Sequence, residues 1–169
     1  MKKVDTQIFK AYDIRGIYPD QIDEEVSYRI GRALVSFLEA DKVACGRDMR
    51  ISSPALSKAF MEGAADQGAD VTDIGLCSTD MLYFASGVLD CPGAMFTASH
   101  NPKEYNGLKM CRRLAGPISA DTGIVDIREL VLANEFPSPS KRGEVEEKDL
   151  LPQYVGHVLG FIDVSAIQP

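Results

Sequence analysis

A short polar sequence, Ser99-His100-Asn101-Pro102, interrupts two apolar segments of this chain. It follows the apolar run 93–97 and precedes a second segment, 105–111, that carries Lys109. A serine at the end of a strand-like segment can act as a nucleophile, either for acyl transfer or as a carrier of a phosphoryl group. It can also simply form a turn with the asparagine and the proline.

The pattern around Ser99 does not favour a serine hydrolase. The glycines of a G-x-S-x-G nucleophile elbow are absent. The chain has two histidines, and in an extended segment the side chain of His100 would point away from Ser99. The second histidine, His157, lies far along the chain on a later helix. A catalytic triad within this chain is therefore disfavoured.

Positive charges near Ser99 fit a phosphate carrier better, because a phosphoserine holds close to two negative charges at neutral pH. Lys103 and Lys109 flank the loop, and Arg15 and Arg47 end two other strand-like segments. The turn at Asn101 can also present backbone N–H groups to an anion. Simpler roles remain open, since Arg47 can pair with Asp48, and both lysines can be solvated or extend along the surface. Gly107 indicates either a bulge or a ligand close to the backbone.

Alternating strands and helices must position these residues. Apolar spacing and capping residues predict helices over 24–39, 53–67, 79–89 and 121–134, the first with Asp23 as its N-cap and the second with Ser53. They predict strands over 42–46, 71–75, 93–97 and 105–111, and an extended segment over 6–18 with a sharp turn at Arg15-Gly16. The fold class is α/β, with a mixed, mostly parallel sheet of about four strands and helices on both faces. The Ser99 loop should lie at the carboxyl edge of that sheet, where such folds bind ligands.

Composition narrows the partners and the compartment. The chain has 169 residues and a net charge of −7, which argues against nucleic acid and anionic membranes as partners. No apolar run is long enough to cross a bilayer and the N-terminus lacks a signal-peptide core, so we expect a cytoplasmic protein. The four cysteines form no C-x-x-C pair and are expected to be buried thiols.

We expect three regions along the chain. Residues 1–135 form the domain that carries the Ser99 loop, and 136–149, rich in proline, serine and charge, form an exposed connection. Residues 150–169 form an amphipathic helix that leads to a second domain outside the sequence.

Three blocks of sequence, in this order, resemble the α-D-phosphohexomutase family, which includes phosphomannomutases and phosphoglucomutases. They are FKAYDIRG at 9–16, GRD at 46–48 followed by Arg50 and Ser52-Ser53, and TASHNP at 97–102 followed by YNGLK at 105–109. The resemblance covers the chain to about residue 135 and implies the first domain of that family.

The resemblance implies a mechanism and roles for particular residues. Phosphoserine at Ser99 donates its phosphoryl group to a hexose monophosphate of mannose or glucose, and a bisphosphorylated sugar reorients and returns the other group, moving phosphate between C6 and C1. Arg15, Lys109 and His100 are the implied catalytic partners of Ser99, and Tyr12, Asn101 and Arg47 the implied substrate-binding residues. Mg²⁺ is held by the phosphate on Ser99 and by aspartates of another domain, and a bisphosphorylated hexose acts as activator.

The resemblance stops at the first of four domains. No D-x-D-x-D run occurs, and the acidic cluster over 144–149 lacks that alternation. We therefore expect these residues alone to be inactive, with the remaining domains of the same full-length chain as their partners. A non-catalytic anion-binding α/β module remains the alternative.

Overall fold

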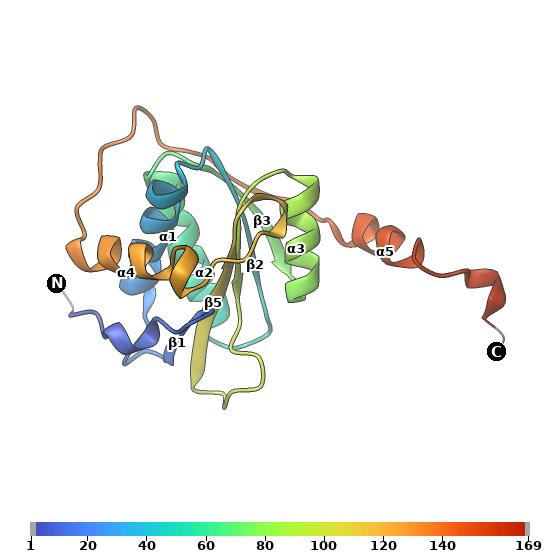
Figure 1. Cartoon of the computed structure of the whole chain (residues 1–169), viewed down its shortest axis with the longest axis horizontal. Helices are drawn as coiled ribbons and strands as arrows, with labels where there is room; N and C mark the ends of the chain where they lie inside the picture. The colour runs from blue at the N-terminus through green and yellow to red at the C-terminus, as the bar shows by residue number, and fades with distance from the viewer. Residues whose placement is uncertain (1–2, 168–169) are drawn as a thin grey trace.

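A six-stranded mixed sheet forms the centre of the computed structural model, which describes residues 3–167 (Figure 1). The strand order is β1-β5-β4-β2-β3-β6. The strands are β1 (Ile14–Ile17), β2 (Lys42–Arg47), β3 (Asp70–Leu76), β4 (Gly93–Phe96), β5 (Tyr105–Cys111) and β6 (Val145–Glu147). Strand β2 pairs in parallel with β3 and β4, and β3 with β6, whereas β5 is antiparallel to both β1 and β4.

The predicted fold class is confirmed, but the strand number is not. The sheet is α/β and mostly parallel, with six strands instead of about four. The two additional strands, β1 and β6, are short edge strands of four and three residues. Strand β6 lies inside the segment predicted as an exposed connection, and its three residues are indeed exposed. Short edge strands depend on the neighbour that pairs with them, so periodicity within their own residues cannot reveal them.

The turn predicted at Arg15-Gly16 is wrong. Both residues belong to β1 and pair with Gly107 and Asn106 of β5. The chain turns after β1, where the backbone N–H of Gln21 donates to the Ile17 carbonyl. The glycine is needed for close packing and not for a turn, since a Cβ at Gly16 would lie 2.8 Å from the Ile8 side chain.

Helices cover both faces of the sheet, as predicted (Figure 1). The α-helices are α1 (Glu24–Leu38), α2 (Ser53–Asp66), α3 (Thr79–Val88), α4 (Ile124–Ala133) and α5 (Leu151–Leu159). Short 3-10 helices are η1 (Thr6–Ile8), η2 (Arg113–Ala115), η3 (Ala120–Thr122) and η4 (Val164–Ala166). Asp23 caps α1 as predicted, accepting a hydrogen bond from Val26 N. Ser53 does not cap α2: Ser52 is the N-cap, and the Ser53 hydroxyl donates to Asp48.

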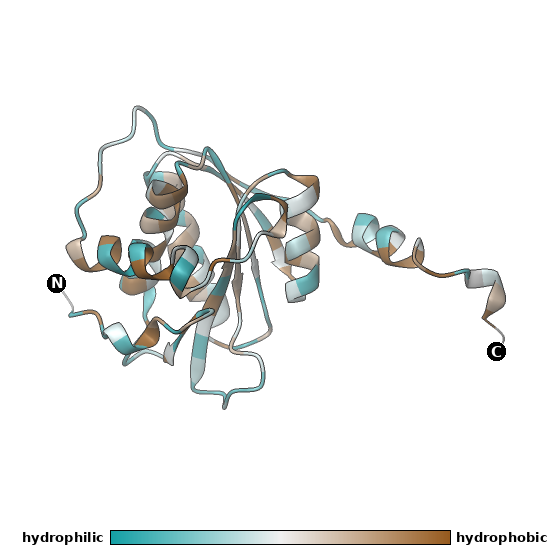
Figure 2. Cartoon of the chain, viewed as in Figure 1, coloured by the Kyte–Doolittle hydropathy of each residue, from teal (hydrophilic) through white to brown (hydrophobic). Residues whose placement is uncertain are grey.

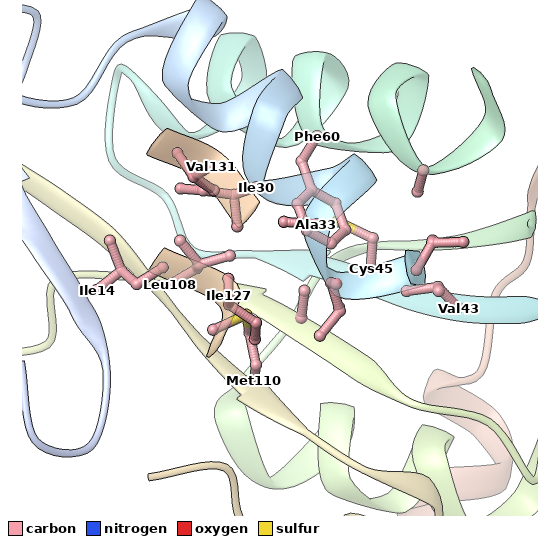
Figure 3. Close-up of a cluster of buried hydrophobic side chains, with 14 of the residues drawn as sticks. Ile14, Ile30, Ala33, Val43, Cys45, Phe60, Leu108, Met110, Ile127 and Val131 are labelled. Carbon is pink, nitrogen blue, oxygen red and sulfur yellow. The ribbon is translucent and has the colours of Figure 1, made fainter. Parts of the chain in front are cut away.

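Two hydrophobic cores hold the layers together. Helices α1, α2 and α4 bury one face of the sheet, where Phe60 of α2 meets Phe96 of β4 edge to face with ring centroids 5.6 Å apart. Figure 3 shows this core between the strands and the helices, with Ile30, Phe60, Leu108 and Val131 among its labelled side chains. The smaller core lies on the other face, where α3 packs its Leu82 near Met95. Because β4 is buried on both faces, its carboxyl end is a rigid base for the loop that follows.

Helix α5 extends away from the sheet (Figure 1). It contacts α3 through rings, with Phe84 5.6 Å from Tyr154 and 5.0 Å from His157, centroid to centroid. Hydrophobic residues continue along α5 and the segment after it (Figure 2), and several of them are exposed, including Leu151, Val155 and Phe161. Within residues 3–167, no helix combines the length and the apolar character that crossing a membrane requires.

The cysteines are free thiols, three buried and one partly buried. Burial raises the pKa of Cys77 and of Cys91 to about 11, and raises that of Cys45 and Cys111 as well. At pH 8 a thiol of pKa 11 is only about 0.1% thiolate. We therefore expect labelling by Ellman's reagent at pH 8 to be slow in the folded protein and rapid in urea. Rapid labelling of all four thiols in the folded state would contradict this burial.

Candidate active site

The loop between β4 and β5 carries Ser99 at one edge of the sheet. Strands β1, β2 and β4 run in the same direction and end at this edge, and antiparallel β5 begins there. Ser99 is exposed and has a positive φ of 51°, a left-handed conformation that costs a non-glycine residue about 1–2 kcal/mol. Local strain of this kind is typical of functional sites. The predicted position of Ser99 at the carboxyl edge of the sheet is confirmed.

His100 lies beside Ser99, contrary to the geometry expected for an extended segment. The Ser99 Oγ and His100 Nδ1 atoms are 3.2 Å apart. The left-handed backbone at Ser99 breaks the alternation of side chains, so both residues point to the same side. Imidazole and hydroxyl are thus within reach for proton exchange.

Hydrogen bonds fix the backbone on both sides of Ser99. Its N–H donates to Thr97 Oγ1 at 2.9 Å, and the Asn101 side-chain amide donates to the Ala98 carbonyl at 3.0 Å. Asn101 therefore shapes the loop, and its predicted contact with substrate stays a prediction.

Arg15 and Lys109 converge on a shared carboxylate, Asp13. Arg15 Nη2 donates to Asp13 Oδ2 at 2.7 Å, and Lys109 Nζ lies 3.6 Å from the same oxygen. Arg15 Nη1 also donates to the carbonyl of Thr97, two residues before Ser99, at 2.7 Å. The guanidinium is buried, which makes its position well defined next to the loop. The structure thus brings both predicted cations to the Ser99 edge.

Arg47 and Tyr12 are less closely connected with Ser99. Arg47 ends β2 and pairs with Asp73 of β3 at 3.2 Å, so its side chain is turned toward β3 and not toward β4. It lines a different cleft, with Leu76 and Lys148. The Tyr12 side chain is 74% exposed in the segment that precedes β1. Substrate binding by these two residues stays a prediction.

Sequence reasoning missed several residues of this edge. Asp13 is the anion between Arg15 and Lys109, and Arg50 donates to backbone carbonyls of the Ser99 loop. Asn106 is fully buried and its amide donates to the Ser52 and Ser53 hydroxyls at 2.8 and 3.0 Å. Arg50 and Asn106 both lie in the sequence blocks quoted above, but spacing along the chain could not show that these blocks contact each other.

A cleft of about 690 Å³ opens beside Ser99. Its walls include Tyr18 after β1, Asp48 and Ser52 after β2, and Lys103 of the loop. This volume suits a small ligand. Among the described residues, no group of three or more histidine, cysteine or acidic side chains is arranged to hold a metal ion.

The molecule belongs to the class of three-layer α/β domains, and its serine and cations lie at the edge of the sheet where such folds commonly bind ligands. Residues 6–138 match the family profile described as phosphoglucomutase/phosphomannomutase, alpha/beta/alpha domain I. The chain belongs to the phosphoglucomutase/phosphomannomutase family.

Individual relatives support the same family membership. A phosphomannomutase of Escherichia coli is 45% identical over 160 residues, which cover 93% of this chain and 35% of that protein. A phosphomannomutase of Klebsiella pneumoniae is 46% identical over 150 residues, which cover 87% of this chain and 96% of that sequence. A phosphoglucomutase/phosphomannomutase family structure from Burkholderia thailandensis superimposes with a TM-score of 0.87 at 34% identity, covering 95% of this chain and 37% of that one. The chain thus spans little more than a third of the length of most of the first relatives that it matches.

Proposed function

We propose that this chain is the phosphoserine-bearing domain of a phosphohexomutase that moves phosphate between C6 and C1 of mannose or glucose. The observation that carries the proposal is the placement of Ser99 beside His100, with Arg15 and Lys109 at the same edge of the sheet. Family membership and relatives named phosphomannomutase support it. We assign the full reaction to a protein of the relatives' length, and these 169 residues alone are inactive on this proposal.

The reaction begins with a phosphorylated Ser99 and a hexose monophosphate. The sugar's free hydroxyl oxygen forms a bond to phosphorus while the bond from phosphorus to Ser99 Oγ breaks. The hydroxyl loses its proton to a base and Ser99 Oγ gains one, so charge and protons balance. In the second transfer, Ser99 Oγ forms a bond to the phosphorus of the other phosphate of the bisphosphorylated sugar, and the bond from that phosphorus to the sugar oxygen breaks. This step regenerates phosphoserine.

Each neighbouring group has a role in that transfer. His100 is close enough to Ser99 Oγ to supply and remove its proton. Arg15 and Lys109 offset the charge that the phosphoryl oxygens carry in the transition state, while Asp13 holds both cations in place. Tyr12, Asn101 and Arg47 are proposed to contact the substrate.

The described residues do not by themselves fit a complete Mg²⁺ site. Ser99, through its phosphate, supplies one ligand position, and Mg²⁺ needs several oxygen ligands in near-octahedral geometry. The remaining ligands are proposed to come from another domain of the full-length protein. A bisphosphorylated hexose would supply the first phosphoryl group to Ser99. The division of the chain near residue 135 and the cytoplasmic location stay predictions.

Mass spectrometry of the full-length protein tests the proposal. After incubation with a hexose 1,6-bisphosphate, we expect one added phosphoryl group, located on Ser99. Loss of that group on addition of hexose monophosphate, with formation of bisphosphate, would show transfer. Absence of phosphate on Ser99 together with full mutase activity would overturn the proposal, and absence of both would favour the anion-binding module.

Removing the Lys109 charge should slow the reaction. In Lys109→Met the side chain keeps its approximate length but loses its ammonium group, and we expect kcat of the full-length protein to fall about 100-fold. Steady-state kinetics with hexose 1-phosphate measure this change. Lys141→Met, at an exposed lysine of the 136–149 segment, is the matched control and should retain normal kcat. Equal kcat for both variants would remove Lys109 from the mechanism.

A further inference from the structure

Arg50 lies beneath the Ser99 loop although it belongs to a different part of the chain. It follows β2, in the segment between Arg47 and the start of α2, and its side chain is 12% exposed. The loop that it contacts is separated from it by about fifty residues in sequence. Loops with exposed side chains have little packing of their own, so a largely buried cation next to one can define its shape.

The guanidinium uses its N–H groups on this loop. Nη2 donates to the Ser99 carbonyl at 2.9 Å and to the Asn101 carbonyl at 2.7 Å. Nη1 donates to the carbonyls of Pro102 and Tyr105, at 2.8 and 2.9 Å. Four backbone carbonyls are thus satisfied by one side chain, including that of the serine itself.

Asp48 forms an ion pair with the Arg50 guanidinium and so orients it. Arg50 Nε lies 3.4 Å from Asp48 Oδ2, and the other carboxylate oxygen accepts from Arg50 N and from the Ser53 hydroxyl. The Asp48 backbone N–H donates to the Phe96 carbonyl at 2.8 Å, which joins this segment to the end of β4. Arg50 and Asp48 therefore connect the Ser99 loop to the end of β4.

These contacts argue against a role for Arg50 in binding a substrate phosphate, and they require an arginine at this position. A guanidinium has five N–H groups, and here the four on Nη1 and Nη2 donate to loop carbonyls while the Nε side forms an ion pair with Asp48. The Arg50 guanidinium is therefore engaged with protein groups and is not assigned to a substrate phosphate. Lysine has the charge but only three donors without the planar arrangement, so it cannot reproduce the contacts.

We infer that Arg50, oriented by Asp48, is a positioning residue that fixes Ser99 in its left-handed conformation and so aims Oγ at the substrate. This inference rests on the proposed function, because it assigns Arg50 to the same phosphoryl transfer. It distinguishes Arg50 from Arg15 and Lys109, which are proposed to offset the charge of the transferring group. The effect of Arg50 should appear in kcat and not in substrate affinity.

Kinetics of the full-length protein test this role. We expect Arg50→Gln to lower kcat about 100-fold, since a displacement of about 1 Å at a reacting group has an effect of that size, and to leave KM within about threefold. Arg50→Lys should not restore kcat. Arg128→Gln removes a partly exposed arginine of α4 as a matched control and should behave like the unaltered protein.

Hydrogen exchange supplies a readout that does not depend on activity. In Arg50→Gln and Arg50→Lys, peptides that cover residues 99–105 should exchange faster, while those of β2 and β3 should not change. Unaltered exchange over 99–105, a raised KM with normal kcat, or full activity of Arg50→Lys would each overturn the inference. If the protein without substitutions has no mutase activity, the proposed function fails. Even then, normal hydrogen exchange over 99–105 in the Arg50 variants would refute the positioning by Arg50.

Discussion

Replacing Ser99 by alanine is expected to lower the mutase kcat of the full-length protein by at least about four orders of magnitude. The hydroxyl oxygen is the atom that carries the phosphoryl group, so its removal eliminates the covalent step and leaves only binding and charge stabilisation. The fold should persist, because the Ser99 side chain is exposed and its left-handed backbone is equally available to alanine. Coupled assays of hexose 6-phosphate formation and mass spectrometry of the 99–105 region measure the two losses together.

Ser140→Ala provides the matched control for this experiment. Ser140 is an exposed serine in the 136–149 segment, away from the sheet edge that carries Ser99. It should retain both activity and the phosphate. Normal interconversion of hexose phosphates by Ser99→Ala would eliminate the phosphoserine mechanism, and with it the roles of His100, Arg15 and Lys109.

Replacing Gly107 by alanine is expected to destabilise the fold by about 3 kcal/mol, since overpacking of a close backbone contact forces strands apart. A Cβ at this position would lie 1.9 Å from the Ile14 carbonyl oxygen and 3.0 Å from the Arg15 Cα. Both are backbone atoms of β1, so no side-chain rotation relieves the clash. The sequence suggested a bulge or a ligand close to the backbone at Gly107, but the neighbour that lies close to it is the backbone of strand β1. Urea denaturation measures the loss.

Gly87→Ala is the control for this change. It lies within α3, and a Cβ there meets nothing within 4 Å. Alanine at Gly87 should stabilise the helix by about 0.5–1 kcal/mol. Equal stability of Gly107→Ala and the unaltered chain would show that β1 and β5 separate easily. In the full-length protein Gly107→Ala should also lower kcat, because Gly107 pairs with Arg15.

Local sequence signals predicted most of the regular elements. The helical spacing and the Asp23 cap defined α1, and the strands β2, β3, β4 and β5 were predicted with boundaries close to the observed ones. Gly68, which follows the last residue predicted for α2, has a positive φ of 102°, as a glycine that ends a helix often does. These features depend on residues within one or two turns of each other, so a single segment contains the information.

Contacts between distant segments explain the errors. Strand β1 forms because β5 pairs with it, and β6 because β3 does. His100 reaches Ser99 because hydrogen bonds and Arg50 hold the loop in a left-handed conformation that no local pattern indicated. The guanidinium of Arg47 pairs with Asp73 of β3. The pair forms because β3 lies next to β2 in the sheet, and the order of strands is not visible in either segment alone.

The amino-acid sequence alone shows which groups are available for chemistry: one serine followed by a histidine, with arginines and lysines in blocks that resemble a known family. Which of these groups contact one another depends on the folded arrangement of the chain. This arrangement placed Asp13 between Arg15 and Lys109, turned Arg47 toward β3, and put Arg50 beneath the serine. Hydrogen bonds and ion pairs act over a few ångströms in space, while partners such as Asp13 and Lys109, or Arg50 and Ser99, are separated by tens of residues along the chain.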